Sequence, residues 1–78
     1  MIDVKSPDHP YMQIAKQLRD GIASGEYDGP LPSVKAIARE TGVATGTVNH
    51  AYEILKEEGL VYSVPGRGMF VRKDAAGG

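Results

Sequence analysis

Hydrogen-bonding residues gather on one face of the segment that follows residue 44. Four apolar residues recur there at helical spacing and predict a buried stripe: Val48, Ala51, Tyr52 and Leu55. The opposite face carries small or polar residues: Gly46, Thr47, Asn49, His50 and Glu53. An Asn carboxamide can bond both N6 and N7 of an adenine, although Asn49 and His50 could each be ordinary solvated surface. We expect a helix that opens near Thr45 and presents a binding face.

A second binding candidate lies in the sequence Pro65-Gly66-Arg67-Gly68. The two glycines let the backbone turn tightly and come close to a phosphate, while the arginine projects from the turn. A purely structural turn needs the glycines but has no use for an exposed arginine. Arg67 and Gly68 are therefore candidate binding residues.

Ser33 and Lys35 begin another short helix, whose apolar positions recur at Val34, Ile37 and Ala38. Ser33 is better explained as the helix cap than as a reader of bases, because its side chain can accept from the unpaired amides of the first turn. The same helix start can place backbone amides against a phosphate, so the two roles are compatible. Lys35 adds a cation beside it.

The chain lacks the residue clusters that catalysis and metal binding require. It has no nucleophile with a base beside it, no cluster of histidine and carboxylates, and no phosphate-binding loop between a strand and a helix. Cysteine is absent, and His9 and His50 are too few and too separated to suggest zinc. We expect a protein that is not an enzyme and that holds no metal or cofactor.

The formal net charge of −1 argues by itself against a polyanionic partner, but the distribution of charge matters more. Residues 31–52 and 61–73 hold one acid, Glu40, against these cations: Lys35, Arg39, Arg67, Arg72 and Lys73. The other acids are expected on the far side of the domain, among them Asp20, Glu26, Asp28, Glu57 and Glu58. An ordinary mixed surface is the alternative.

The 78 residues allow one domain with a small core. A first helix is expected from Pro10 to the residue before Gly25, with this apolar stripe: Tyr11, Ile14, Ala15, Leu18 and Ile22. A turn-rich link leads through Leu31 to the helix-turn-helix of residues 33–58, which turns at Gly42. Residues 60–64 and 69–72 predict a hairpin that must pack on the helices to be stable. The fold class is mainly α with a small β-hairpin, a winged helix-turn-helix of three helices plus a two-stranded wing.

Four segments in order, PYMQIAKQLRDGIASGEY, LPSVKAIARETGV, TVNHAYEILKEEGLVYS and GRGMFV, resemble the DNA-binding domain of GntR-type bacterial transcription regulators. Each motif is weak alone, but together they cover residues 10–72 in register. The piece from Asn49 to Tyr52 is most similar to the branch with short C-terminal regions. The resemblance implies a transcription regulator, a repressor, that binds double-stranded operator DNA as a homodimer. It also implies that helix 45–58 lies in the major groove and wing tip 65–68 at the minor groove.

Three positions depart from the family pattern, which usually has Arg where this chain has Lys35 and Thr45, and often Arg where it has Asn49. An arginine offers a planar fork for guanine or phosphate, whereas Lys is a point charge and Thr or Asn reaches less far. We therefore expect weaker binding and a changed base preference. The rival interpretation is a winged helix for protein contacts with little or no DNA binding, which would explain both the missing arginines and the negative net charge.

The remaining expectations concern the setting and the ends of the chain. No apolar run approaches the roughly 20 residues that span a bilayer, and MIDVKSPDHP has no apolar signal-peptide core, so a cytoplasmic protein without membrane contact is expected. Residues 1–9 are expected to form an N-terminal arm, residues 10–73 the winged helix, and residues 74–78 a flexible tail. No small-molecule effector site is expected within this chain.

Overall fold

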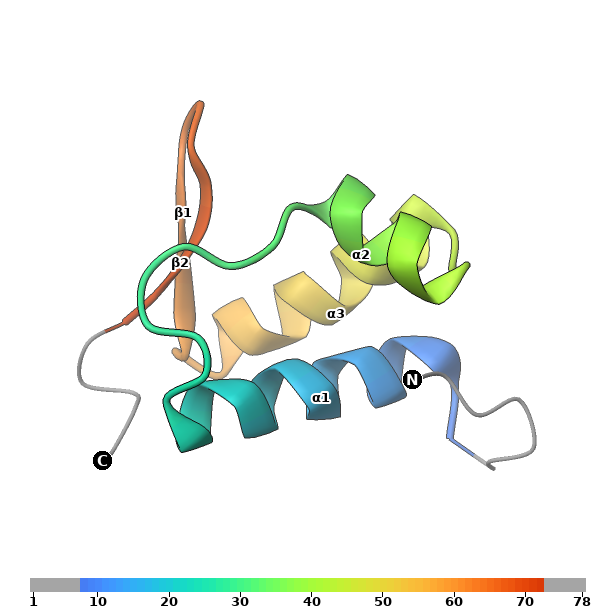
Figure 1. Ribbon diagram of the computed structural model, residues 1–78, viewed down its shortest axis with the longest axis horizontal. Coiled ribbons are helices and arrows are strands. Elements are labelled where there is room, and N and C mark those ends of the chain that lie inside the picture. Colours follow the sequence, from blue (N-terminus) through green and yellow to red (C-terminus); the bar gives the residue numbers. More distant parts are fainter. Residues whose placement is uncertain (1–7, 73–78) are drawn as a thin grey trace.

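Three helices precede a two-stranded antiparallel hairpin in the computed structural model, which describes residues 8–72 (Figure 1). The helices are α1 (Pro10–Ser24), α2 (Val34–Thr41) and α3 (Thr45–Glu57), and the strands are β1 (Val61–Val64) and β2 (Gly68–Val71). This is the predicted winged helix-turn-helix. Residues 1–7 of the expected arm, residue 73 at the end of the expected winged helix and the expected tail, residues 74–78, lie outside the described part of the chain.

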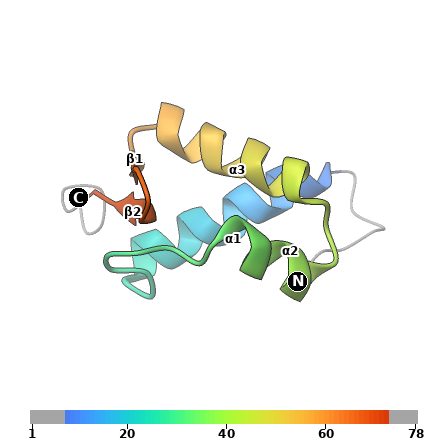
Figure 2. The ribbon, with the colours of Figure 1, turned by 90° about the horizontal axis from the view of Figure 1, so that it is seen from above.

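The core forms where α3 packs against both α1 and α2, and the hairpin closes one end of it (Figures 1 and 2). The predicted stripes of α1 and α3 supply most of the buried residues: Ile14, Ala15, Leu18, Ile22, Val48, Ala51, Tyr52 and Leu55. Tyr11, predicted to belong to the first stripe, is only half-buried. Because α3 is fixed along one side by these contacts, its opposite side is held rigidly outward.

The turn between α2 and α3 has the predicted caps, with one correction. Ser33 Oγ accepts from the amide of Ala36 at 3.0 Å, and Gly42 adopts φ +75°, which ends α2 in the left-handed conformation. Helix α3 opens at Thr45, as expected, but the further interpretation that a threonine at this helix start also caps it is wrong. The capping position belongs to Ala44, which has no side-chain oxygen, and Thr45 is the first helical residue.

The close contact between Gly21 of α1 and Tyr27 was not predicted from the sequence. Gly21 is buried in the last turns of α1, and a Cβ there would lie 2.5 Å from the ring of Tyr27. The amide of Tyr27 also donates to the Gly21 carbonyl at 3.1 Å. The chain therefore folds back over α1 directly after this helix ends.

The wing is tied to the helices by the link that precedes α2. In the hairpin Val61 pairs with Val71 and Tyr62 with Phe70, and Arg67 N donates to Val64 O at 2.9 Å to close the turn. The amide of Leu31 donates to Met69 O at 2.9 Å, so the predicted short extended piece lies beside β2. The strand bounds differ from the prediction by one residue: β1 begins after Leu60, and β2 begins at Gly68, which was expected in the turn, and ends before Arg72.

Candidate nucleic-acid interface

The outward face of α3 carries the first group of candidate residues. Thr45, Gly46 and Asn49 are exposed, whereas Thr47 is half-buried and its amide donates to Ala44 O at 3.0 Å. Gly46 has open space where a Cβ would lie and an ordinary helical backbone, so neither packing nor conformation within the chain requires glycine there. The first turn of α3 can therefore be approached closely from outside.

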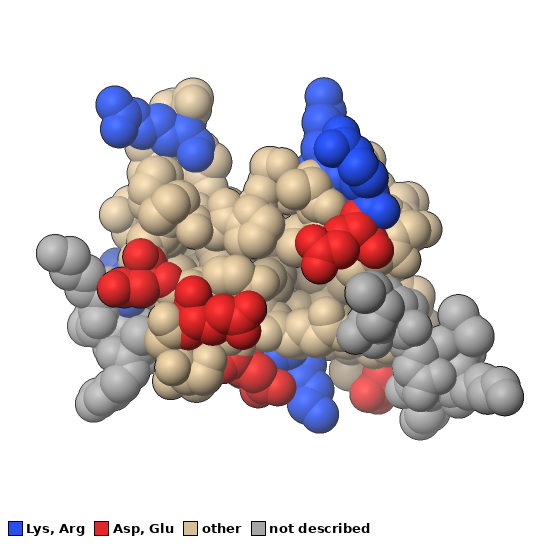
Figure 3. Space-filling model, viewed as in Figure 1, with Lys and Arg blue, Asp and Glu red and all other residues tan. Residues whose placement is uncertain are grey.

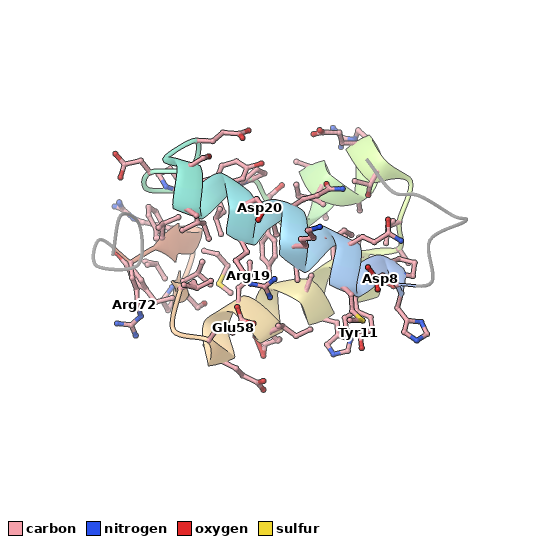
Figure 4. The ribbon with its side chains drawn as sticks, turned by 90° about the horizontal axis from the view of Figure 1, so that it is seen from below. Asp8, Tyr11, Arg19, Asp20, Glu58 and Arg72 are labelled. Atoms are coloured by element: carbon pink, nitrogen blue, oxygen red, sulfur yellow. The ribbon has the colours of Figure 1, made fainter. Side chains whose placement is uncertain are left out.

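His50 faces the N-terminal end of α1 instead. Its ring stacks on Tyr11 with 4.2 Å between the ring centroids and 18° between the planes. Tyr11 also stacks on His9, with 5.8 Å between the centroids. Figure 4 shows Tyr11 at this end of α1. The structure thus places His50 on the flank of α3 that meets α1, a contact that helical periodicity alone did not indicate.

The tip of the wing and the start of α2 carry the other candidates. Arg67 is exposed in the turn between β1 and β2, and Gly66 and Gly68 on either side have φ of +77° and +97°. A side chain would strain this turn at both positions, so the glycines expose the arginine without crowding it. Lys35 is exposed in the first turn of α2, where Ser33 Oγ is already engaged as the cap.

A groove of about 330 Å³ separates the wing from the helices. It brings together four of the candidate residues: Ser33, Asn49, Arg67 and Gly68. The other candidates are not part of its lining: Lys35, Thr45, Gly46, Thr47 and His50. Three exposed lining residues with polar side chains were not among the candidates proposed from the sequence: Glu53, Lys56 and Ser63. Their helical spacing from Asn49 could have suggested the first two, but the position of the wing could not be derived from spacing.

The cations of this region stand on one edge of the molecule. Lysine and arginine side chains occupy the two upper points in Figure 3, over the wing and over α2, and the surface is hollowed between them. The acidic side chains on this face lie lower (Figure 3). Three of the five predicted cations are exposed here, Lys35 and Arg39 on α2 and Arg67 on the wing turn. Arg72 instead follows the far end of β2, with its guanidinium 5.9 Å from the centre of the Tyr62 ring, and Lys73 lies outside the described residues. A locally basic edge therefore exists despite the negative net charge.

Tyr52 fixes the floor of the groove. It is only 3% exposed, and its hydroxyl donates to the backbone carbonyl of Pro32 in the link. Burial raises the pKa of Tyr52 to about 12, with a smaller contribution from Tyr27, so the phenol stays protonated at neutral pH. The hydrogen bond joins α3 to the residue before Ser33 and so holds the start of α2 beside the recognition face. Tyr52 is therefore a support, as the sequence predicts.

An ion pair on the lower side of the molecule neutralises one of the acids. Arg19 Nε and Nη2 donate to the two carboxylate oxygens of Glu58 at 3.0 and 2.8 Å, which joins α1 to the end of α3 (Figure 4). The hydrogen bond and charge of Glu58 raise the pKa of Arg19. Both side chains are about 40% exposed, so the pair contributes at most about 1 kcal/mol to stability. It lies away from the basic edge.

Residues 8–72 contain neither a candidate metal site nor a helix that could span a membrane. No three acidic or histidine side chains there lie together as a metal site would require. None of the helices in this part of the chain has the length and apolar character needed to cross a bilayer.

Known proteins resemble the chain in sequence and in structure. The family profile described as "Bacterial regulatory proteins, gntR family" matches residues 10–71. The transcriptional repressor NagR of Bacillus subtilis (strain 168) is 43% identical over 74 residues, which is 92% of this chain and 30% of NagR. An uncharacterized transcriptional regulator of Rhizobium meliloti (strain 1021) is 48% identical over 67 residues, which is 82% of this chain and 28% of that protein. The chain thus spans less than a third of these curated relatives.

Two solved structures share the fold. YtrA from Sulfolobus acidocaldarius, a GntR-family transcription factor, superposes with a TM-score of 0.84 at 39% identity, over 94% of this chain and 79% of that one. The DNA-binding domain of AraR, solved in complex with an operator, gives a TM-score of 0.78 at 28% identity, over 92% of each chain. The chain therefore belongs to the gntR family of bacterial regulatory proteins, and residues 10–71 form the winged helix-turn-helix that this family shares.

Proposed function

We propose that residues 10–72 bind double-stranded operator DNA and that the protein represses transcription. Helix α3 would enter the major groove with Thr45, Gly46, Thr47 and Asn49 at its leading end, and wing tip 65–68 would lie at the adjacent minor groove. The names of NagR, a repressor, and of the AraR domain, solved with its operator, support this proposal. A bacterial regulator with this function would act in the cytoplasm, where the operator DNA lies.

The observation that carries the proposal is the arrangement of charge around α3. Exposed cations stand on both sides of its outward face, on the wing turn and on α2, while the acids of the same view lie lower (Figure 3). Each groove of DNA is bordered by one row of phosphates on either side. Cations on both flanks of a helix that lies in the groove can therefore contact phosphates.

The proposed complex contains two copies of the chain on paired half-sites. Helix-turn-helix proteins commonly match a two-fold operator with two-fold protein symmetry. We propose no effector pocket for the winged helix itself, because its groove lies open on the proposed DNA-binding side.

Fluorescence anisotropy with the 78-residue chain tests this function. A labelled duplex of mixed sequence, and a duplex enriched by repeated selection from a random pool, are titrated between about 50 and 200 mM salt. Affinity for both duplexes should fall steeply as the salt concentration rises. In a plot of the logarithm of the binding constant against the logarithm of the salt concentration, each neutralised phosphate contributes about −0.9 to this log-log slope. The enriched duplex should bind more tightly. Absence of salt-sensitive binding would favour a winged helix for protein contacts and would refute the proposal.

A further inference from the structure

Two charged side chains of the groove between the wing and α3, Glu53 and Lys56, take no part in the proposed contacts at the major and minor grooves. Glu53 and Lys56 project from α3 into its lining, and Ser63 and Arg67 line it from the wing. Both α3 side chains are exposed, and they lie three positions apart, on one side of the helix. The charged lining therefore consists of two cations and one carboxylate.

The geometry of B-DNA indicates what such a groove would hold. A major groove and the neighbouring minor groove are separated by a single sugar-phosphate strand. A protein that places α3 in one groove and the wing tip in the other must straddle this strand. The groove between α3 and the wing would lie at that position, and its lining includes Asn49 on the helix and Arg67 on the wing.

We propose, on the basis of the proposed function, that this groove receives one DNA strand, with Lys56 contacting a phosphate and Glu53 repelling the same strand. Lys56 is then a binding residue in the last turn of α3, beyond the first turns that reach base edges. Glu53 is a carboxylate that limits affinity without reading sequence. Lys56 should raise DNA affinity and Glu53 should lower it. Both effects should be independent of base sequence, because both side chains act on the sugar-phosphate backbone of the DNA.

Two matched pairs of variants isolate these effects. Lys56→Gln is compared with Lys16→Gln, which removes an exposed lysine of α1 outside the groove. Glu53→Gln is compared with Glu57→Gln, which removes an exposed carboxylate of α3 outside the groove. The two variants of a pair change the net charge by the same amount. A difference in DNA binding between them therefore results from the position of the charge that was removed. Thermal melting confirms that all four variants fold.

The expected results are read as log-log salt slopes on the mixed-sequence and the enriched duplex. Lys56→Gln should weaken binding on both and make the slope shallower by about 0.9, which is the loss of one phosphate contact. Glu53→Gln should tighten binding on both, most strongly at low salt, because salt screens the repulsion that it removes. Lys16→Gln and Glu57→Gln should change the slope much less.

Two results would overturn this assignment while leaving the proposed function intact. The first result is that the wild type binds DNA, but Lys56→Gln changes affinity and salt slope no more than Lys16→Gln does. In that case no DNA strand passes through the groove. If Glu53→Gln alters affinity on the enriched duplex alone, Glu53 reads a base, since a carboxylate can accept from cytosine N4. A wild type without salt-sensitive binding would instead refute the proposed function, and this inference with it.

Discussion

Arg67 is the residue whose exposure is hardest to explain without DNA. It projects from a turn whose neighbours, Gly66 and Gly68, have positive φ, and the hairpin closes through its backbone amide. A narrow A·T-rich minor groove concentrates negative potential and attracts an inserted arginine. Arg67→Ala should therefore weaken binding most on duplexes with A·T-rich flanks, with almost no change in melting temperature. Titrations against A·T-flanked and G·C-flanked duplexes at one salt concentration measure this. An equal loss on both would indicate a plain phosphate contact, and no loss would show that Arg67 only solvates the turn.

Gly46 offers a test in which stability and binding should move in opposite directions. Nothing in the chain lies within 4 Å of a Cβ at this position, and glycine costs a helix up to about 1 kcal/mol relative to alanine. Gly46→Ala should raise the melting temperature. It should also weaken DNA binding, because the added methyl group occupies the space through which α3 approaches a base pair or backbone. Calorimetry and anisotropy on the same preparation measure the two effects. Tighter or unchanged binding would show that the first turn of α3 does not approach DNA closely.

At the scale of the elements, Tyr52 connects α3 to the link before α2. Tyr52→Phe removes the hydroxyl that bonds the Pro32 carbonyl and should cost about 1 kcal/mol of stability. The pKa of this phenol is raised to about 12 in the folded protein, whereas an unfolded tyrosine has an ordinary value near 10. The stabilisation that the protonated Tyr52 phenol gives to the folded state is therefore fully present below about pH 10 and is lost as pH rises toward 12. Chemical denaturation at pH 7 and at alkaline pH should show wild type and variant converging in stability. A gap that stays constant would contradict this role.

The elements themselves were predictable because their determinants are local. Helical spacing and the residues at Ser33, Gly25 and Gly42 located α1 and α2, and the alternating strands around Gly66 located the wing within one residue. The cap of α3 was mistaken because a threonine next to a turn is a frequent cap, yet the helix begins one residue earlier in the chain than that interpretation requires.

The contacts that join distant segments were not predictable from these local patterns. Nothing in the spacing of α1 indicates that Gly21 must leave room for Tyr27, or that His50 of α3 stacks on Tyr11. The same holds for the groove, because its walls come from α3, the link and the wing. Four of the residues that line the groove were candidates from the sequence, namely Ser33, Asn49, Arg67 and Gly68. Glu53 and Lys56 share a helix with Asn49, but only the position of the wing opposite them made them candidates.

At the scale of the whole molecule, the described surface offers little from which to build a stable dimer. Among residues 8–72 the exposed large hydrophobic side chains are Met12 and Tyr62, at 44% and 42% exposure, and they lie on different elements. A stable interface usually buries a contiguous patch of about 800 Å² on each partner. We therefore expect the 78-residue chain to be monomeric at low micromolar concentration and to pair only on DNA.

Sedimentation with and without DNA tests this expectation. On a duplex that carries two selected half-sites about one helical turn apart, two copies should bind cooperatively, because neighbouring domains then lie on one side of the duplex. Inserting about half a turn between the half-sites should leave each site occupied but abolish the cooperativity. A stable dimer in the absence of DNA would contradict the expectation and would point to α1 or to residues 1–10 as the interface. Cooperativity that survives the insertion would show that the two copies interact through DNA shape and not by contact.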